Sequence, residues 1–202
     1  MEMSISNNLE SNIRQRAKVD YNQGEIITDV AFVFACPGQE ELKANKVVYG
    51  STGKNLELLL QELKRINFPG INHDGENSVR YGYLITNASN RVYYKGYLQS
   101  KRTLPYALDI YSNDNKERLK KELNGKKIIV CFGKNAYKTI SKIKKREGSL
   151  GWKVIESIHL GFQSINKKIA VTDEFNVKNC IEKVQARIRI IAENILKKYN
   201  EL

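Results

Sequence analysis

Side chains with useful chemistry follow several apolar runs of this sequence, close to the points where the runs end. Two carboxylates, Glu40 and Glu41, come shortly after the first run, Asn87 ends the second, and His159 lies near the end of the last. A carboxylate can activate water, an amide can pair with a hydrogen-bonding edge, and an imidazole can stabilise a developing negative charge. These residues form a candidate binding or catalytic site if the fold brings the ends of the runs together.

The apolar runs predict strands, because they are short, bounded by turn residues and rich in β-branched or aromatic side chains. They span 29–36, 80–87, 126–133 and 152–160. Helical patterns span 53–66, 115–123, 134–145 and 174–200, with one further candidate around 6–17. Strands that alternate with helices predict an α/β fold, a three-layer α/β/α sandwich around a mainly parallel four-stranded sheet. Such sheets bind ligands at the carboxyl ends of their strands, where the polar segments would converge.

Length and composition favour one domain over residues 1–202. With 41% apolar residues the chain can bury a core, and no repeat, long linker or low-complexity segment marks a boundary. We expect the core at about 29–166, followed by the helical segment 174–200. The 34 Lys and Arg residues against 22 Asp and Glu give a net charge of +12, which favours encounters with nucleic acid. The alternative explanation of the charge is the general composition of a Lys-rich proteome.

Cysteine usage and the N-terminal residues indicate a reducing, cytoplasmic setting. Cys36, Cys131 and Cys180 are odd in number and form no C-x-x-C pair, which argues against a disulfide framework or a four-cysteine metal or cluster site. The N-terminal MEMSISNNLESNIRQ is acidic and polar, and no apolar run approaches the length of a membrane span. We therefore expect no export, no membrane association and no bound metal.

The segment GSTGKN at 50–55 has only a superficial similarity to a phosphate-binding loop. A Walker A loop needs a glycine where this chain has Val48 and a Ser or Thr where it has Asn55, and it follows a strand directly. A nucleoside triphosphatase is therefore disfavoured. Gly50 and Gly53 are either positions that a ligand or the next helix approaches closely, or simply a tight turn before a helix.

The spacing of several motifs resembles that of the uracil-DNA glycosylase superfamily, most closely its bacterial and archaeal iron-sulfur type. The segment FACPGQEELKANKVVYGSTGKNL matches the family's first motif at Pro37, Gly38, Glu41, Gly50, Gly53 and Leu56. Later matches in the same order are Ile85-Thr86-Asn87 for the second motif, Gly133 and Ala136 for the third, and His159-Leu160-Gly161 in place of H-P-S. The resemblance covers roughly 30–165.

This resemblance implies a monomeric DNA glycosylase that hydrolyses uracil or a related modified base from single- or double-stranded DNA, without a cofactor. Such an enzyme flips the nucleotide into a pocket and stabilises the departing anionic base. The resemblance implies that Asn87 reads the base and that His159 hydrogen-bonds it as negative charge grows. The substrate-binding residues that it implies are Cys36, Pro37, Gly38, Tyr49 and Asn87.

The position of the water-activating acid departs from the family pattern. In the family this acid aligns with Ala35 or Cys36, and neither is an ordinary general base at neutral pH. Glu40 or Glu41 could supply the carboxylate from the loop, and the alternative is that both are ordinary surface acids. Cys36 is expected to be a packed thiol rather than a nucleophile. The cluster-binding cysteines of the family are absent, so no iron-sulfur cofactor is implied.

Other departures concern base stacking and DNA contact. The family's stacking Phe aligns with Val48, so Tyr49 is the candidate stacking residue, and Leu160 or Phe162 is the candidate wedge for the gap left by a flipped base. The segment 90–106 interleaves cations with tyrosines, which suits phosphate contact and base stacking, or alternatively a half-buried strand or loop. The predicted DNA-contacting residues are Gly50, Ser51, Lys54, Arg91, Lys95 and Phe162.

Two other functions stay open. Because both usual acid positions are replaced, the chain could be a catalytically impaired glycosylase-fold protein that only binds DNA. It could also act on a free nucleobase or nucleotide, which would need no basic surface. The second histidine, His73 in the loop INHDGEN, matches no motif and is expected to be solvated.

Overall fold

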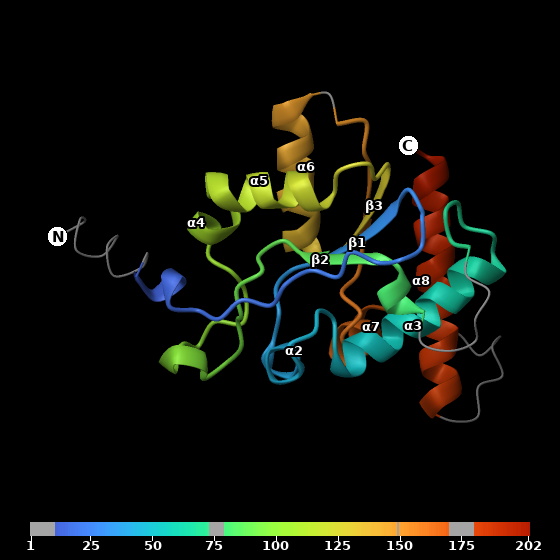
Figure 1. Ribbon diagram of the computed structural model, residues 1–202. Coiled ribbons are helices and arrows are strands. Elements are labelled where there is room, and N and C mark those ends of the chain that lie inside the picture. The colour runs from blue at the N-terminus through green and yellow to red at the C-terminus, as the bar shows by residue number, and fades with distance from the viewer. Residues whose placement is uncertain (1–10, 73–78, 149, 170–179) are drawn as a thin grey trace.

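Four short strands form one sheet in the computed structural model, which describes residues 11–72, 79–148, 150–169 and 180–202 (Figure 1). The strands are β1 (Val30–Phe34), β2 (Leu84–Asn87), β3 (Ile128–Phe132) and β4 (Lys153–Ser157). Their order is β2-β1-β3-β4, and every neighbouring pair is parallel. The predicted α/β fold with a four-stranded sheet is confirmed, and the sheet is entirely parallel rather than mainly so.

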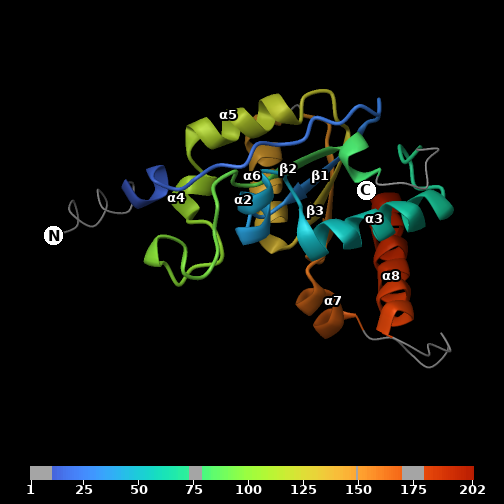
Figure 2. The ribbon, with the colours of Figure 1, turned by 60° about the horizontal axis from the view of Figure 1, so that its bottom comes forward.

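Helices pack on both faces of the sheet, because successive strand residues point to opposite faces. Val30 and Phe32 of β1 belong to the core on one face, and Ala31 and Val33 belong to the core on the other. The longer helices of the described chain are α3 (Gly50–Arg65), α5 (Asn113–Glu122), α6 (Lys134–Glu147) and α8 (Cys180–Asn200). Figures 1 and 2 show α3 and α8 on one side of the sheet and α5 and α6 on the other.

Shorter helical segments, which the sequence did not predict, lie in the connections between the strands. They are α2 (Gln39–Ala44), α4 (Ala107–Ile110), α7 (Phe162–Lys168) and the 3-10 turns η1 (Arg80–Gly82) and η2 (Tyr97–Gln99). The η1 turn corrects the predicted strand at 80–87, whose first part is not extended. Asn22 holds this part, because its side-chain amide donates to the carbonyls of Tyr81 (2.7 Å) and Tyr83 (2.8 Å).

The chain N-terminal to β1 runs antiparallel along the free edge of β2. Asn22 and Ile85 exchange two backbone hydrogen bonds, of 2.8 and 2.9 Å. A further antiparallel bridge joins Lys18 to Arg91 in the loop after β2. An unpaired strand edge is a template for association with other chains, so this segment protects β2.

The predicted helices are present with shifted ends. The helix expected at 53–66 begins at Gly50, so both glycines of GSTGKN lie in its first turn. Of the candidate helix around 6–17, residues 11–14 are helical, and its earlier residues lie outside the described chain. The terminal helix is described from Cys180 onward, so the predicted part before it lies outside the described residues as well.

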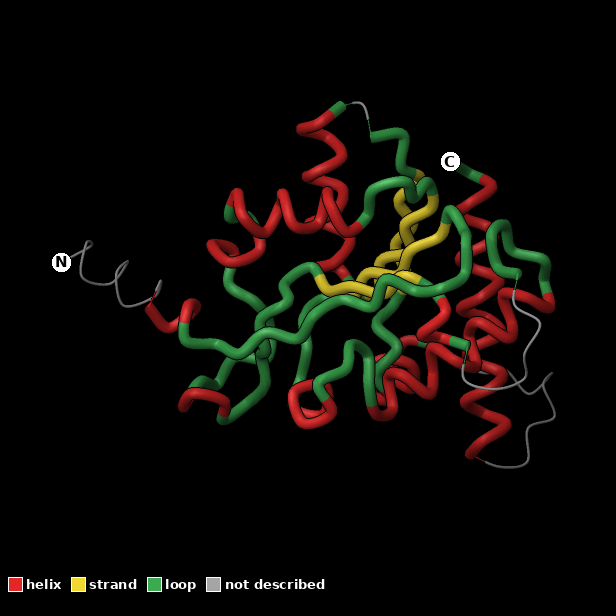
Figure 3. Tube along the Cα trace, viewed as in Figure 1, coloured by secondary structure: helices red, strands yellow, loops and turns green. Residues whose placement is uncertain are grey.

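The segments that follow the strands gather at one end of the sheet. Figure 3 shows the loops that leave the strands, and Figure 1 places α2, the start of α3 and α7 near one another. One contact ties two of these segments directly, because the side-chain amide of Asn55 in α3 donates to the carbonyl of Leu160 after β4 (2.7 Å). Within the described residues, no helix has the length and apolar character needed to cross a membrane.

Candidate active site

A pocket of about 230 Å³ lies at the carboxyl ends of β1, β2 and β4. Several residues singled out in the sequence line it, and they are Cys36, Gly38, Glu41, Asn87 and His159. These residues lie at the end of β2 or in the segments that follow β1 and β4, so the convergence at the carboxyl edge follows from the parallel sheet. The structure therefore brings together an amide, an imidazole, a carboxylate and a thiol.

Asn87 ends β2 and lines the pocket with its side chain. Its backbone is held from behind, because the guanidinium of Arg118 donates to its carbonyl (2.8 Å) while pairing with Glu122 (2.7 Å). The residue is 3% exposed, and its side-chain amide has no hydrogen-bond partner among the described residues. The amide is therefore positioned by a fixed backbone and free to pair with a ligand.

His159 follows β4 and is held as a neutral imidazole with a defined tautomer. The backbone N–H of Gly161 donates to its Nδ1 (2.9 Å), so the ring proton lies on Nε2. Burial, and secondarily the positive charge of Lys168, lower the pKa of His159 below its ordinary value. The ring meets Phe34 edge to face, with centroids 6.3 Å apart. His159 thus presents an Nε2–H donor at neutral pH.

The loop that carries His159 is held by close packing and a buried hydrogen bond. Leu160 is fully buried, and its carbonyl accepts the hydrogen bond from the buried amide of Asn55. Gly161 has ordinary extended backbone angles, but a Cβ there would lie 2.9 Å from Nδ1 of His159. A side chain at 161 would therefore force the imidazole of His159 to shift.

The two candidate carboxylates lie in different places. Glu41 lines the pocket, and its Oε2 accepts from the backbone N–H of Gly38 (3.0 Å). Burial raises the pKa of Glu41 above its ordinary value, although the backbone amides of Glu41, Gly38 and Tyr49 act in the opposite direction. Glu40 is exposed outside the pocket lining and pairs with Lys43 (3.2 Å). Only Glu41 is placed to act on a ligand in the pocket.

The residues at the family's acid positions carry no charge here. Ala35 is buried, and its carbonyl accepts from the backbone N–H of Ser89 (3.0 Å). The thiol of Cys36 donates to the carbonyl oxygen of Thr103, with 3.8 Å between sulfur and oxygen. Burial raises the pKa of this thiol to about 12. The carbonyl of Pro37 accepts from the backbone of the loop after β2. Cys36 therefore stays a protonated thiol at neutral pH.

Other lining residues were missed by the sequence analysis, and they are Val48, Thr52, Tyr93, Thr103 and Leu104. The hydroxyl of Tyr93 donates to Asp109 (3.1 Å), and the guanidinium of Arg16 lies 4.2 Å from the centre of its ring. Burial and the carboxylate of Asp109 raise the pKa of Tyr93, so its hydroxyl stays protonated. The Tyr-rich composition of 90–106 was a signal for this segment, but it pointed to DNA contact rather than to a pocket wall.

The candidate stacking residue and the predicted DNA-contacting residues lie outside this pocket. Val48 lines the pocket, whereas Tyr49 is outside its lining and 41% exposed. Ser51, Lys54 and Lys95 are exposed, and Gly50 opens α3. Phe162 is 57% exposed at the start of α7, whereas the other candidate wedge, Leu160, is fully buried. Arg91 is half-buried and paired with Asp109 (3.3 Å).

Comparisons with known proteins identify no relative. A scan against protein-family models finds no match, and a search of curated proteins finds none either. Among the residues that the structure describes, no group of three His, Cys, Asp or Glu side chains gathers as a metal site would. His73 lies outside the described residues.

Proposed function

We propose that the protein is a DNA glycosylase of uracil-glycosylase-like fold that hydrolyses the N-glycosidic bond of uracil or a related modified base. The observation that carries the proposal is the meeting of Asn87, His159 and Glu41 around one pocket at the carboxyl edge of the sheet. The pocket volume of about 230 Å³ is smaller than the roughly 300–1,000 Å³ of sites for drug-sized ligands. A single base flipped out of a strand is a ligand of suitable size.

Asn87 and His159 supply complementary parts of the proposed chemistry. The free amide of Asn87 offers one acceptor and two donors, which can pair with the N3–H and O4 edge of uracil. When the glycosidic bond breaks, negative charge accumulates on the base oxygens. The Nε2–H of the neutral His159 ring can donate to such an oxygen and stabilise the departing anion.

Glu41 is the residue proposed to activate water. A general base acts best when its pKa is close to the working pH, and burial shifts the pKa of Glu41 upward in that direction. The carboxylate lies in the first turn of α2 and lines the pocket with Cys36 and Gly38, which the proposal places on the sugar side. A water held there would attack the sugar carbon while His159 stabilises the base.

The partner in this proposal is DNA. The net charge of +12 favours a polyanion, and the exposed Lys54 and Lys95 offer phosphate contacts. Phe162 is the better of the two candidate wedges, because its ring is exposed whereas Leu160 is buried. An exposed aromatic ring close to the loop of His159 can fill the gap left by a flipped base.

One observation favours a second function, DNA binding without catalysis. Both positions that carry the acid in the family hold groups without charge, Ala35 and the protonated thiol of Cys36. If Glu41 only caps the N-terminus of α2, the protein can hold a base in the pocket without hydrolysing the N-glycosidic bond. The two functions differ in turnover, because a binding protein retains salt-dependent DNA affinity but cleaves nothing.

The test is single-turnover cleavage of labelled oligonucleotides that carry uracil, hypoxanthine, xanthine or hydroxymethyluracil, followed by alkali to break abasic sites. The proposal predicts cleavage of at least one substrate by the wild type, and loss of this cleavage in Asn87→Ala and His159→Ala. In a gel-shift titration the same variants should still bind DNA. Salt-sensitive binding without cleavage of any substrate would support the binding protein instead.

A further inference from the structure

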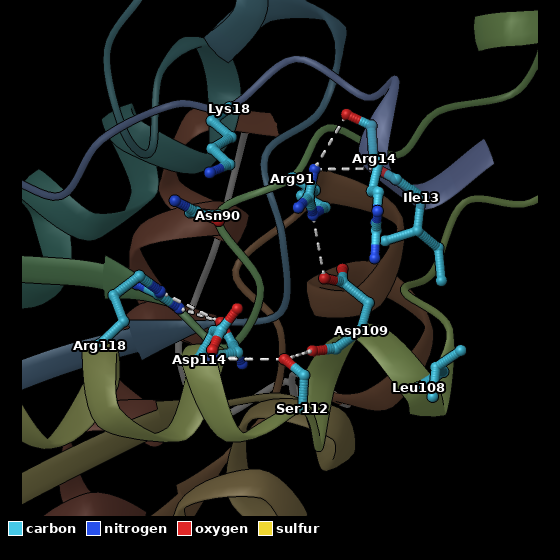
Figure 4. Close-up of a pocket in the computed structure, with 11 residues that line it drawn as sticks. Ile13, Arg14, Lys18, Asn90, Arg91, Leu108, Asp109, Ser112, Asp114 and Arg118 are labelled. Carbon is cyan, nitrogen blue, oxygen red and sulfur yellow. Dashed lines mark hydrogen bonds and ion pairs between the residues drawn. The ribbon is translucent and has the colours of Figure 1, made fainter. Parts of the chain in front are cut away.

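A second pocket, of about 420 Å³, lies beside the candidate base pocket (Figure 4). Asp109 links the two, because its Oδ1 pairs with Arg91 (3.3 Å), which lines the second pocket, and its Oδ2 accepts from Tyr93, which lines the first. The other walls come from the N-terminal segment, the loop after β2 and the start of α5. None of the candidate catalytic residues lines this pocket.

Hydrogen-bond donors on one side of the second pocket are available to a ligand. Lys18 is exposed at the rim of the pocket, and its ammonium has no ion pair or hydrogen bond with any described residue. Arg91 uses Nε for Asp109 and Nη1 for the carbonyl of Ile13 (2.9 Å), which leaves its Nη2 without a partner in the described chain. The side-chain amide of Asn90 is equally free of described partners. Figure 4 shows Lys18, Asn90 and Arg91 around the same space.

The opposite side of the pocket offers an acceptor and apolar surface. Asp114 is exposed in the first turn of α5, and its carboxylate has no partner among the described residues. A carboxylate repels phosphate but accepts hydrogen bonds from sugar hydroxyls, as acidic residues do in nucleotide sites. Leu108, which is 45% exposed, and the buried Ile13 supply apolar contact. This pattern suits a ligand with a phosphate at one end and hydroxyls at a distance from it.

We propose that this second pocket binds a free 5′-mononucleotide. Lys18, Arg91 and Asn90 hold the phosphate through charge-assisted and neutral hydrogen bonds. Asp114 accepts from the sugar hydroxyls, and Leu108 packs against the nucleoside. The volume of about 420 Å³ lies within the roughly 300–1,000 Å³ of small-molecule sites. The inference goes beyond the proposed function, because it requires neither cleavage nor the pocket that contains Asn87 and His159.

Calorimetric titration of the full chain tests the inference with uridine 5′-monophosphate, uridine and inorganic phosphate as separate ligands. We expect saturable binding of the nucleotide, weaker binding of phosphate and no binding of uridine. Lys18→Ala should lower the affinity for the nucleotide at least about fivefold, as expected for the loss of a partly exposed charged contact. Lys145→Ala removes an equal charge from the exposed end of α6, remote from the lining, and should change nothing.

Asp114→Ala separates a nucleotide site from a site for any phosphate. The variant should bind uridine 5′-monophosphate severalfold more weakly, because it lacks the acceptor for the sugar hydroxyls. It should bind inorganic phosphate more tightly, because the carboxylate that repels phosphate is gone. A 5′-phosphorylated DNA tetranucleotide should not displace the nucleotide, because its first sugar has no free hydroxyl. Absence of saturable nucleotide binding, an unchanged affinity in Lys18→Ala, or full displacement by the tetranucleotide would each overturn the proposal. His159→Ala should bind the nucleotide normally, so this result does not depend on glycosylase activity.

Discussion

The substitution Gly161→Ala tests whether the position of His159 controls the reaction. Position 161 has φ −66° and ψ 142°, which any residue adopts, so an added methyl group introduces no backbone strain. The methyl carbon would lie 2.9 Å from Nδ1 and 3.1 Å from Cε1 of His159. The imidazole must therefore move away, and its hydrogen bond from the N–H of residue 161 must lengthen or break.

The size of the effect follows from the distance that the ring must move. Ordinary contact with a Cβ begins at 3.4 Å, so the ring must retreat by about 0.5 Å, the difference from 2.9 Å. Complete loss of a donor to a developing anion costs about 10²–10³ in rate, which is the expectation for His159→Ala. A misplacement of about 1 Å can cost about a hundredfold, so we expect Gly161→Ala to slow single-turnover cleavage about tenfold to a hundredfold.

A double-mutant cycle provides the control. If the methyl group acts only through the imidazole, adding Gly161→Ala to His159→Ala should change the cleavage rate by less than about twofold. Nuclear magnetic resonance of the ring nitrogens gives a readout that needs no activity, because the chain has only 2 histidines. The wild type should show the Nε2-protonated tautomer of His159, and Gly161→Ala should shift these signals. Full activity in Gly161→Ala, or multiplicative losses in the double variant, would refute the reasoning.

Further predictions concern the ionisable groups of the pocket. Glu41→Gln should lower the cleavage rate by about 10²–10⁴ if Glu41 is the general base, whereas Glu40→Gln should not, and single-turnover rates compare them directly. Glu41→Gln should also be more stable than the wild type in urea at pH 7, because burial raises the pKa of Glu41 and so disfavours its charged form in the folded state. Because the pKa of His159 is lowered in the folded state, the unfolded chain binds more protons than the folded chain below the ordinary histidine pKa of about 6.5. Acidification through that pH should therefore destabilise the wild type more than His159→Gln, as measured by urea midpoints, and equal pH dependences would contradict this. Since burial raises the pKa of Cys36 to about 12, iodoacetamide should alkylate Cys36 at pH 8 far more slowly in the folded protein than in denaturant, and equal rates by mass spectrometry would argue against a buried thiol.

The sheet could be predicted from the sequence because buried parallel strands are continuous apolar runs. The runs 29–36, 126–133 and 152–160 each contain a strand of five residues, whereas 80–87 begins with the η1 turn. The cause of this exception is remote in sequence, since Asn22 holds the turn through the carbonyls of Tyr81 and Tyr83. The same segment covers the edge of β2, and no local pattern announces such a pairing. Backbone pairing between segments that are remote in sequence could therefore not be predicted from local patterns.

The candidate site was predictable where a residue ends or follows a strand. Asn87 and His159 are of this kind, and the parallel sheet alone brings them to one edge. The sequence did not predict that Val48 rather than Tyr49 lines the pocket, because the choice depends on the backbone conformation at Val48. Val48 has φ +50°, a left-handed conformation rare for a β-branched residue, and this turn directs the next side chain outward. Such a reversal depends on the packed loop and not on local propensity.

The loop after β1 bears most directly on the choice between an enzyme and a binding protein. Its first positions hold Ala35 and the protonated Cys36, so no acid stands where the chain leaves the strand. The short helix α2 then reverses the chain, and its first turn brings Glu41 back until the carboxylate accepts from the N–H of Gly38. A carboxylate that served only to cap α2 would gain from full exposure to water, whereas burial raises the pKa of Glu41. Glu41 is half-buried, and its carboxylate both caps α2 and lines the pocket, which is compatible with the proposed hydrolase.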